Sequence, residues 1–413
     1  MPAVRLAIFL LTYVLIAVET IPGVRLNRPA ASLLGAVAMV ALGGLSPREA
    51  YAAIDLDVIV FLLGLLLISA YLELGSFFDW AAYQIVRHTR SPSTLLAALV
   101  GASGLLAALF INDTVCLVFT PVVILALRPL GLRPQPYLLA IALGSNVGSA
   151  ATIIGNPQNM LIGVTSGISF ARFSLMLLPA VLGALACVYG VLALVYRNEL
   201  KAELRHAADG EPPALDRPLV VTVLVVFGAA VIAWLAGLSL PLVSITAGAV
   251  VIALARRDAA AAFANVEWSL LLFFASLFVV VQGVRDLPLF EELTSRAAGL
   301  LTGAPLRDAA VMTGAMTALS NLVSNVPAVL LWLPVMPRVT DAHFIWLVMA
   351  MSATFAGNLT LVASMANLIV AERAAARGVR LRFGEYFRVG LPVTALTLGW
   401  GIVTLLAMRA LFA

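Results

Sequence analysis

Runs of about 20 apolar residues recur along the whole of this 413-residue chain, and they constrain its fold more than any other feature. A helix of that length rises 1.5 Å per residue and crosses the ~30 Å hydrocarbon core of a bilayer. Hydrophobic residues make up 62% of the chain and charged residues 11%, so polar groups could not cover its surface in water. The longest polar stretch, 197–217, has only the size of a connecting loop. The sequence therefore predicts a polytopic membrane protein without a separate soluble domain.

The apolar runs repeat in the same order at an interval of about 212 residues. The runs 4–22, 30–45 and 54–74 match 218–237, 241–255 and 267–283. Asn146 in Gly-Ser-Asn-Val-Gly matches Asn358 in Ala-Gly-Asn-Leu-Thr, and after a short deletion Asn159 matches Asn367. Several matches in one order indicate a tandem duplication joined by the 197–217 loop.

Each half contains five full spans, and between the third and the fourth lies an apolar stretch interrupted by polar residues. These stretches, 93–127 and 308–337, are too short for two crossings and too long for one, so we expect re-entrant hairpins buried in protein. Glycines and a proline within 136–163, and Gly357 within 342–370, predict broken helices. The predicted fold is an all-α membrane protein with two inverted-topology repeats of five transmembrane helices, 1–196 and 218–413. Each repeat carries a re-entrant hairpin and a broken helix.

The positions of the basic residues predict how the chain is oriented. If both termini lie outside, 17 of the 25 Lys and Arg residues fall in cytoplasmic loops. These are Arg25, Arg28, Arg87, Arg90, Arg128, Arg133, Arg197, Lys201, Arg205, Arg217, Arg256, Arg257, Arg373, Arg377, Arg380, Arg382 and Arg388. The positive-inside rule then favours periplasmic termini in a bacterial inner membrane, with a cytoplasmic 197–217 linker.

Unpaired polar groups are costly inside a bilayer, so polar clusters at hairpin tips and helix breaks point to a binding site. We expect repeat one to supply Asn112, Asp113, Thr114, Ser145, Asn146, Thr152, Asn156 and Asn159. We expect repeat two to supply Ser324, Asn325, Asn358, Thr360 and Asn367, with Thr354 and Ser364 beside them. A broken helix exposes carbonyls that suit a cation and N–H groups that suit an oxyacid. Alternatively, single amides among them only hold the broken helices together.

Asp113 is the one acid predicted deep in the membrane, at the tip of the first hairpin, where repeat two has the apolar Val326. Desolvation favours its neutral form and a bound cation favours its carboxylate, which suits a carrier of H⁺ or Na⁺. We expect a Na⁺ ion to contact Asp113, Asn112 and Asn146. Asp113 could instead be a structural acid that caps the second arm of the hairpin. The acids Glu73 and Glu267 lie near span ends and are expected at the membrane interface.

Other functional classes find little support in the sequence. Gly101-Ala-Ser-Gly104 matches the GxSG pattern of intramembrane serine proteases, which leaves a hydrolase using Ser103 as a remote alternative. The sequence has no phosphate-binding loop for ATP, although an ATPase partner stays open. No cofactor and no nucleic-acid partner are expected.

The motifs resemble those of the ion transporter superfamily, which holds arsenite permeases, NhaD-type sodium/proton antiporters and divalent anion/sodium symporters with a citrate-transporter-like domain. Residues 112–121, Asn-Asp-Thr-Val-Cys-Leu-Val-Phe-Thr-Pro, resemble the first-hairpin motif of the arsenite permease and NhaD branches. Residues 145–159 resemble their broken-helix motif, and Ser324-Asn-Val-Pro-Ala328 with Gly357-Asn-Leu-Thr360 completes the likeness. The symporters of dicarboxylates typically carry Ser-Asn-Thr at both tips, and this chain does not.

The resemblance implies a secondary active permease for a small inorganic anion or oxyacid, arsenite and antimonite included, coupled to H⁺ or Na⁺. The alternatives are a Na⁺/H⁺ antiporter, a Na⁺-coupled dicarboxylate or citrate symporter, and a passive channel. The expected partners are the ion substrate and the lipid bilayer. The resemblance also implies a homodimer through the first two spans of each repeat.

Overall fold

The computed structural model describes residues 1–18, 26–201 and 213–412, and within these ranges the chain is helical and has no β-strand. The predicted all-α fold is therefore confirmed, and most of the predicted linker, 202–212, lies outside the described residues. The helices before the linker are α1 Pro2–Ala17, α2 Arg28–Ala41, α3 Pro47–Ala53, α4 Leu56–Leu74, α5 Phe77–His88, α6 Pro92–Leu109, α7 Asn112–Leu127, α8 Gln135–Ser149, α9 Pro157–Ser166 and α10 Phe170–Val195. Those after it are α11 Arg217–Leu235, α12 Leu240–Leu254, α13 Ala259–Ala264, α14 Trp268–Arg285, α15 Pro288–Gly299, α16 Pro305–Val323, α17 Asn325–Trp332, α18 Ala342–Ala356, α19 Met365–Ala375 and α20 Phe383–Phe412.

The two series follow the same order. In each, a long fourth helix is followed by a short one, then by a helical hairpin (α6–α7 and α16–α17) and a broken helix (α8–α9 and α18–α19). Asn146 and Asn358, at the ends of α8 and α18, are 212 positions apart. This order is what a tandem duplication predicts, whereas the opposite orientation of the halves in a membrane stays a prediction.

The full spans are fewer than the apolar runs suggest. Among the described residues, six helices are long and apolar enough to cross a membrane: α4, α6, α10, α11, α14 and α20. Helices α1, α2 and α12, which occupy predicted spans, have only 16, 14 and 15 residues. The apolar runs 30–45 and 241–255 are themselves shorter than the ~20 residues of a full span.

Two amphipathic helices, α5 and α15, stand between the third long apolar segment and the hairpin of each half, where the sequence analysis predicts no element. In α5 the buried residues Phe78, Ala82 and Val86 recur every fourth position, which places them on one face of the helix. The sequence shows this period, but the polar residues between them lower the local hydropathy below that of a span.

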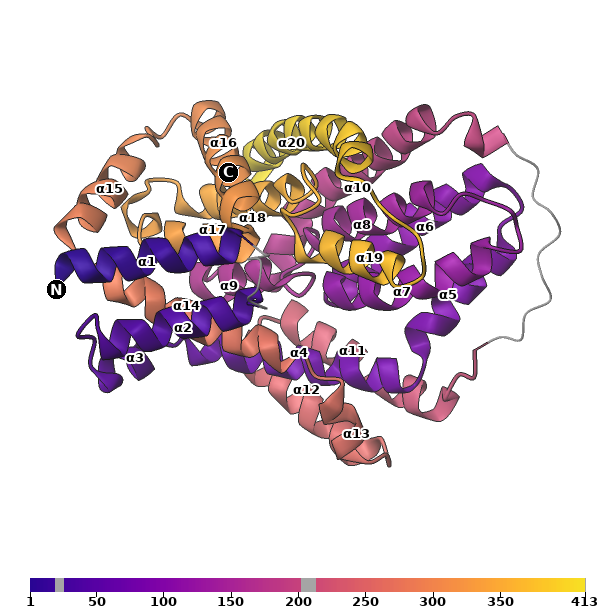
Figure 1. Ribbon diagram of the computed structural model, residues 1–413, viewed down its shortest axis with the longest axis horizontal. Helices are drawn as coiled ribbons and strands as arrows, with labels where there is room; N and C mark the ends of the chain where they lie inside the picture. Colours follow the sequence, from indigo (N-terminus) through magenta and orange to yellow (C-terminus); the bar gives the residue numbers. More distant parts are fainter. Residues whose placement is uncertain (19–25, 202–212, 413) are drawn as a thin grey trace.

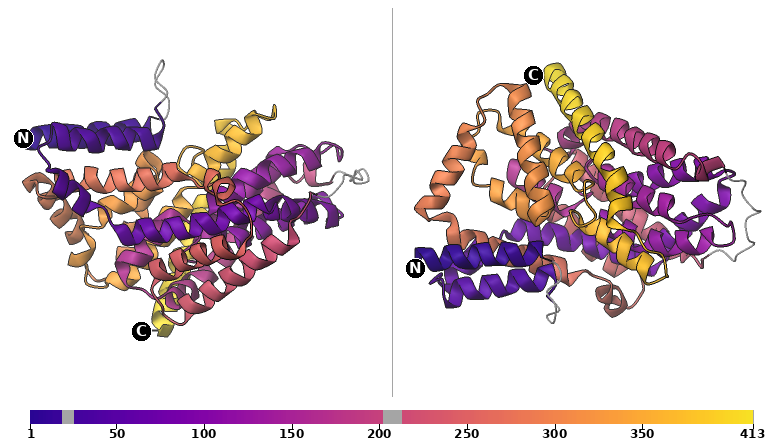
Figure 2. Two further views of the ribbon diagram at one scale, coloured as in Figure 1. Left: turned by 90° about the horizontal axis from the view of Figure 1, so that it is seen from below. Right: turned by 45° about the horizontal axis from the view of Figure 1, so that its top comes forward.

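The two halves are interlocked rather than laid side by side. Helix α2 packs against α14, and α4 against α12, so each half contacts the other through its first helices. The hairpin arm α7 packs against α19, α17 packs against α9, and the long helices α10 and α20 pack together (Figure 1). Helices α1 and α2 lie together at one end of the molecule (Figure 2).

Glycine allows one of these contacts to be very close. A Cβ added to Gly148 of α8 would lie 2.1 Å from the carbonyl oxygen of Gly104 in α6, far inside van der Waals contact. Only a residue without a side chain fits there, and the contact holds the hairpin arm α6 directly on the broken helix.

The sequence explains why α8 and α9 break where they do. Asn156 accepts a hydrogen bond from the backbone N–H of Asn159 (2.9 Å) and so caps α9. Pro157 follows at the first helical position, where its missing N–H costs nothing. A Cβ on Gly155 would lie 2.2 Å from the carbonyl oxygen of Ser149, so the chain can fold back on itself only with glycine there. Gly-Asn-Pro thus separates α8 from α9 and begins α9.

Candidate substrate and ion site

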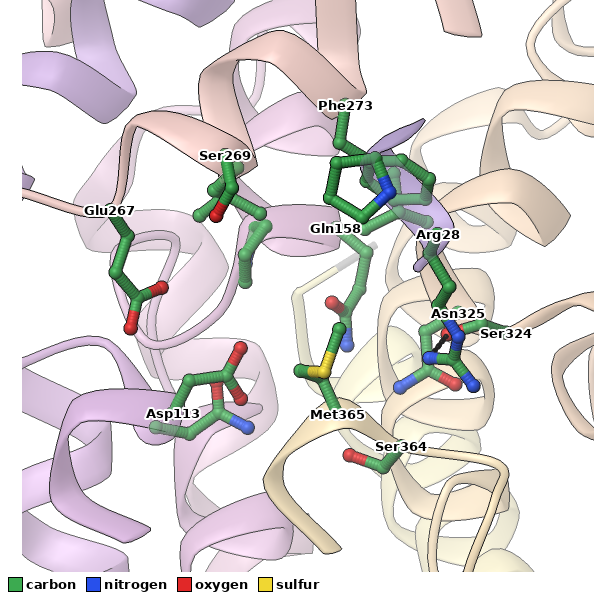
Figure 3. A pocket seen from close by; sticks show the side chains of 15 residues that line it. Arg28, Asp113, Gln158, Glu267, Ser269, Phe273, Ser324, Asn325, Ser364 and Met365 are labelled. Atoms are coloured by element: carbon green, nitrogen blue, oxygen red, sulfur yellow. Dashed lines mark hydrogen bonds between the residues drawn. The ribbon is translucent and has the colours of Figure 1, made fainter. Parts of the chain in front are cut away.

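A cavity of about 90 Å³ lies between the tips of the two hairpins. Its wall includes Asn112 and Asp113 from the first tip and Ser324, Asn325 and Val326 from the second (Figure 3). A buried water needs roughly 10–15 Å³ of such space, so the cavity has room for several waters or one small solute. Of the residues predicted from sequence to bind substrate or ion, Asn112, Asp113, Ser324 and Asn325 line it.

Both hairpin tips and both helix breaks begin a helix at this cavity. Asn112, Pro157, Asn325 and Met365 are the first residues of α7, α9, α17 and α19, and all four line the wall. The N-terminus of a helix carries unpaired N–H groups and a partial positive charge of about half a unit. The backbone therefore makes the cavity favourable for oxygen atoms that carry negative charge.

Three side chains in the wall carry oxygen atoms that have no hydrogen-bond partner among the described residues. The Oδ1 atoms of Asn112 and Asn325 are buried and accept no hydrogen bond. The carboxylate of Asp113, whose residue is 5% exposed, makes no hydrogen bond or ion pair within the described chain. Buried acceptors without a donor are costly, so the site is suited to a ligand that supplies a cation or hydroxyl groups.

Asn146 sits at the centre of a buried amide network that ends at the cavity. Its Nδ2 donates to Oδ1 of Asn358 (3.0 Å) and of Asn367 (3.0 Å). Its Oδ1 accepts from Nδ2 of Asn112 (3.1 Å) and from the hydroxyl of Ser364 (3.0 Å). Because Asn112 and Ser364 both line the cavity, Asn146 connects the two halves one hydrogen bond behind the cavity wall.

Asn159 and Asn367 hold the two helix breaks in the same way. Asn159 Nδ2 donates to the carbonyls of Ser149 (3.3 Å) and Thr152 (3.0 Å). Asn367 Nδ2 donates to the carbonyls of Gly357 (2.7 Å) and Thr360 (3.2 Å). Each amide thus satisfies carbonyls that the preceding helix leaves open, so these amides join the broken helices as the alternative interpretation expects.

The remaining predicted residues support the site rather than form its wall. Thr152 donates to the carbonyl of Ala108 (2.5 Å), and Thr360 donates to Asn321 Oδ1 (3.0 Å). Ser145 donates to the carbonyl of Ala142 (3.1 Å). Asn156 bonds Ser149 Oγ (2.8 Å) besides capping α9. Thr114 lines a separate open cleft beside the cavity.

Arg28, Gln158 and Glu267 also line the cavity, and the sequence analysis does not include them among the site residues. The sequence places Arg28 among the loop charges and Glu267 near a span end, and the structure brings both side chains into the cavity wall. Arg28 donates to Ser324 Oγ (3.1 Å) and to the carbonyl of Val362 (2.9 Å). Helices α2 and α14 therefore begin beside the hairpin tips.

Ser324 joins α16 to α17 with φ 75° and ψ 164°, a conformation that side-chain-bearing residues rarely adopt. The bond from Arg28 holds it there at the second tip. Such strain is typical of functional sites. The sequence predicts Ser324 as a site residue but does not predict its backbone conformation.

The Ser103 hydroxyl is fully buried and lies 3.3 and 3.4 Å from the carbonyls of Val100 and Ala140. The hydroxyl connects α6 to α8 and does not line the cavity. The arrangement as a whole can bind a small ligand through helix N-termini and a cation through carboxylate and amide oxygens.

Comparison with known proteins relates the chain to transporters. The family model described as citrate transporter matches residues 13–351. An uncharacterized transporter of Mycobacterium tuberculosis is 30% identical over 419 residues, which is 96% of each chain. The silicon efflux transporter LSI3 of Oryza sativa subsp. japonica is 28% identical over 460 residues, 94% of each chain. The YdaH transporter of Alcanivorax borkumensis has a similar fold, with a TM-score of 0.58 at 16% identity over 99% of this chain and 98% of that one.

Proposed function

Because this chain belongs to the citrate transporter family and is a multi-pass membrane transporter, we propose that it is a secondary active permease for a small inorganic oxyacid or anion. Arsenite and antimonite are included, and transport is coupled to H⁺ or Na⁺. The observation that carries the proposal is that the helix N-termini at both hairpin tips and both helix breaks converge on one cavity with three side chains whose oxygen atoms have no partner among the described residues.

The size and charge of the cavity support a small substrate with few charges. Among the described residues its wall has one cationic side chain, Arg28, and two acidic ones, Asp113 and Glu267. A di- or tricarboxylate would bring several negative charges next to both acids, at a cost that one guanidinium does not offset. A small oxyacid instead offers hydroxyl groups to the Oδ1 atoms of Asn112 and Asn325, and its oxygens suit the helix N-termini.

The relative from rice supports the same class of substrate. Its name describes it as a silicon efflux transporter, and silicon dissolves in water as a small uncharged oxyacid. Arsenite at neutral pH is also an uncharged oxyacid, so one cavity of this kind would suit either.

Asp113 supports coupling to a cation. A buried carboxylate without a partner is stable only when it binds a proton or a cation. Asp113 would release the bound proton or cation if a movement of the hairpin tip brought the carboxylate into different surroundings. Movement of the tip would in this way be coupled to the cation gradient.

The clefts support the orientation in which both termini are periplasmic in a bacterial inner membrane. Arg133, Arg380 and Arg382 line one open cleft, so basic residues from both halves gather on one face. That face is the cytoplasmic one under the positive-inside rule.

The test is uptake into proteoliposomes with imposed pH or Na⁺ gradients, using arsenite, antimonite, silicic acid and citrate as substrates. We expect wild type to accumulate an oxyacid against its gradient, and Asp113→Asn to equilibrate it without accumulation, because an amide neither exchanges a proton nor binds Na⁺ as tightly. Asp113→Glu should keep part of the accumulation.

Asp57→Asn is the matched control, since Asp57 is an exposed acid at the start of α4. It should transport like wild type. Accumulation by Asp113→Asn with unchanged dependence on both gradients would exclude this residue as the coupling site. Cation exchange in the absence of any oxyacid would instead favour a Na⁺/H⁺ antiporter.

A further inference from the structure

Glu267 occupies the position before α14 at which a side chain normally caps the helix, yet it makes no capping hydrogen bond. Its counterpart before α4 is Asp55, whose carboxylate accepts from the N–H of Val58 (3.1 Å). Aspartate is a preferred residue at this position, and the longer glutamate is not among the favoured caps. The local structural role that explains an acid at Asp55 is therefore absent at Glu267.

The side chain of Glu267 lies instead between two hollow spaces. One is the cavity between the hairpin tips, where Glu267 and Asp113 face one another (Figure 3). The other is an open cleft of about 540 Å³ between α4, α7, α13 and α19. Among the described residues, Glu267 is the one that lines both spaces.

The charges around Glu267 leave it without a fixed counter-ion. Within the described chain the side chain of Glu267 makes no hydrogen bond or ion pair, and neither does the side chain of Asp113 across the cavity. Arg28, on the far wall, is held by Ser324 and Val362. On the cleft side the charged groups are Glu73 of α4 and Glu372 and Arg373 of α19, so acids outnumber bases there too. In both spaces the charged side chains near Glu267 thus favour a cation.

We propose that Glu267 is a second cation-binding carboxylate, at which the coupling cation passes between the open cleft and Asp113. This inference rests on the proposed function, because it concerns the same gradient-driven transport. Asp113 is buried and lines the cavity alone, whereas Glu267 is half-buried and borders both spaces. Glu267 therefore lies between the cleft and Asp113.

The test measures transport in proteoliposomes of known orientation, with NaCl or a pH gradient supplied from one side at a time. Glu267→Gln should raise the cation concentration for half-maximal transport about tenfold when the cation enters from the cleft side, since one attractive charge at the entrance is lost. The value measured from the opposite side should stay within twofold of wild type. The saturating rate should also be retained, because Asp113 is still present.

Two controls separate this role from a general loss of charge or of folding. Glu73→Gln removes an acid that lines the cleft but not the cavity, so it should raise the half-maximal cation concentration from the cleft side by less than Glu267→Gln does. A saturating rate of Glu267→Gln equal to that of wild type is the second control, because it shows that the variant is folded.

Equal effects of Glu267→Gln from both sides, or no effect from the cleft side, would overturn the inference. Failure of the proposed function gives a different result, because wild type itself would then show no dependence on either cation gradient. A wild type that accumulates an oxyacid beside a Glu267→Gln variant with unchanged cation dependence leaves the function in place and removes only the role of Glu267.

Discussion

Replacing Asn146 with alanine removes four hydrogen bonds at once from the buried network behind the cavity. Side-chain hydrogen bonds within membranes contribute about 0.6 kcal/mol on average, and a buried partner left unsatisfied costs roughly 1–3 kcal/mol. The Oδ1 atoms of Asn358 and Asn367 lose this donor, whereas the Ser364 hydroxyl can rotate to another acceptor. We therefore expect Asn146→Ala to lower the free energy of unfolding by about 2–4 kcal/mol.

The assay is equilibrium unfolding in detergent, combined with transport by the same preparations. A double-mutant cycle isolates the contact between the halves: Asn146→Ala and Asn358→Ala together should show a coupling energy of about 0.5–1.5 kcal/mol. Thr222→Val is the matched control, because the Thr222 hydroxyl bonds only within α11, to the carbonyl of Pro218. Its coupling to Asn146→Ala should be zero within about 0.5 kcal/mol.

Both asparagine variants should insert into the membrane, since neither change alters an apolar span, and both should transport more slowly than wild type. Wild-type transport by both variants would assign the two amides a purely structural role. A coupling energy indistinguishable from that of the Thr222 pair would refute the network itself, because it would mean that the two halves do not communicate through this contact.

Three further predictions concern packing, strain and orientation. Gly148→Ala should destabilise the protein by about 2 kcal/mol or more in thermal unfolding, because the added Cβ would collide with the backbone of Gly104. Gly101→Ala is the control and should leave the stability unchanged, because the space around Gly101 is open. Ser324→Ala and Ser324→Gly both lose the hydrogen bond from Arg28, but glycine adopts a φ of 75° without strain. The glycine variant should therefore be the more stable by about 1 kcal/mol. Equal stabilities of the two variants would contradict backbone strain at Ser324. A cysteine at Asp209 should react with impermeant reagents only from the cytoplasm and one at Gly237 only from the periplasm, and the reverse labelling would overturn the orientation.

The parts of the site that the sequence predicts are those with a local cause. Asn156 and Pro157 combine a helix cap with a residue suited to the first helical turn, so their order marks a break in a helix without any tertiary information. The hairpin tips are marked in the same way, by polar residues in the middle of an apolar stretch of unusual length. The interval between Asn146 and Asn358 identifies them as counterparts, although not as direct partners at 3.0 Å.

The site residues that the sequence does not predict depend on where each helix begins relative to the hairpin tips. Arg28 and Glu267 stand at helix starts, and hydropathy treats every helix start as a point near the membrane surface. In the structure α2 and α14 start beside the hairpin tips, which is a property of the packing between the halves. The roles of Asn159 and Asn367 also needed coordinates, because an amide that binds an ion and one that holds two carbonyls look alike in sequence.

The interlocked packing of the halves has a consequence for biosynthesis. At about 5–20 residues per second, translation of the second half takes roughly 10–40 s after the first half has emerged. During that time α2 and α4 are without α14 and α12, and Asn146 has neither Asn358 nor Asn367 to bond. The newly made first half is therefore exposed to membrane proteases and chaperones as an incomplete bundle, and a ribosome that stops within the linker releases a product that quality control should remove.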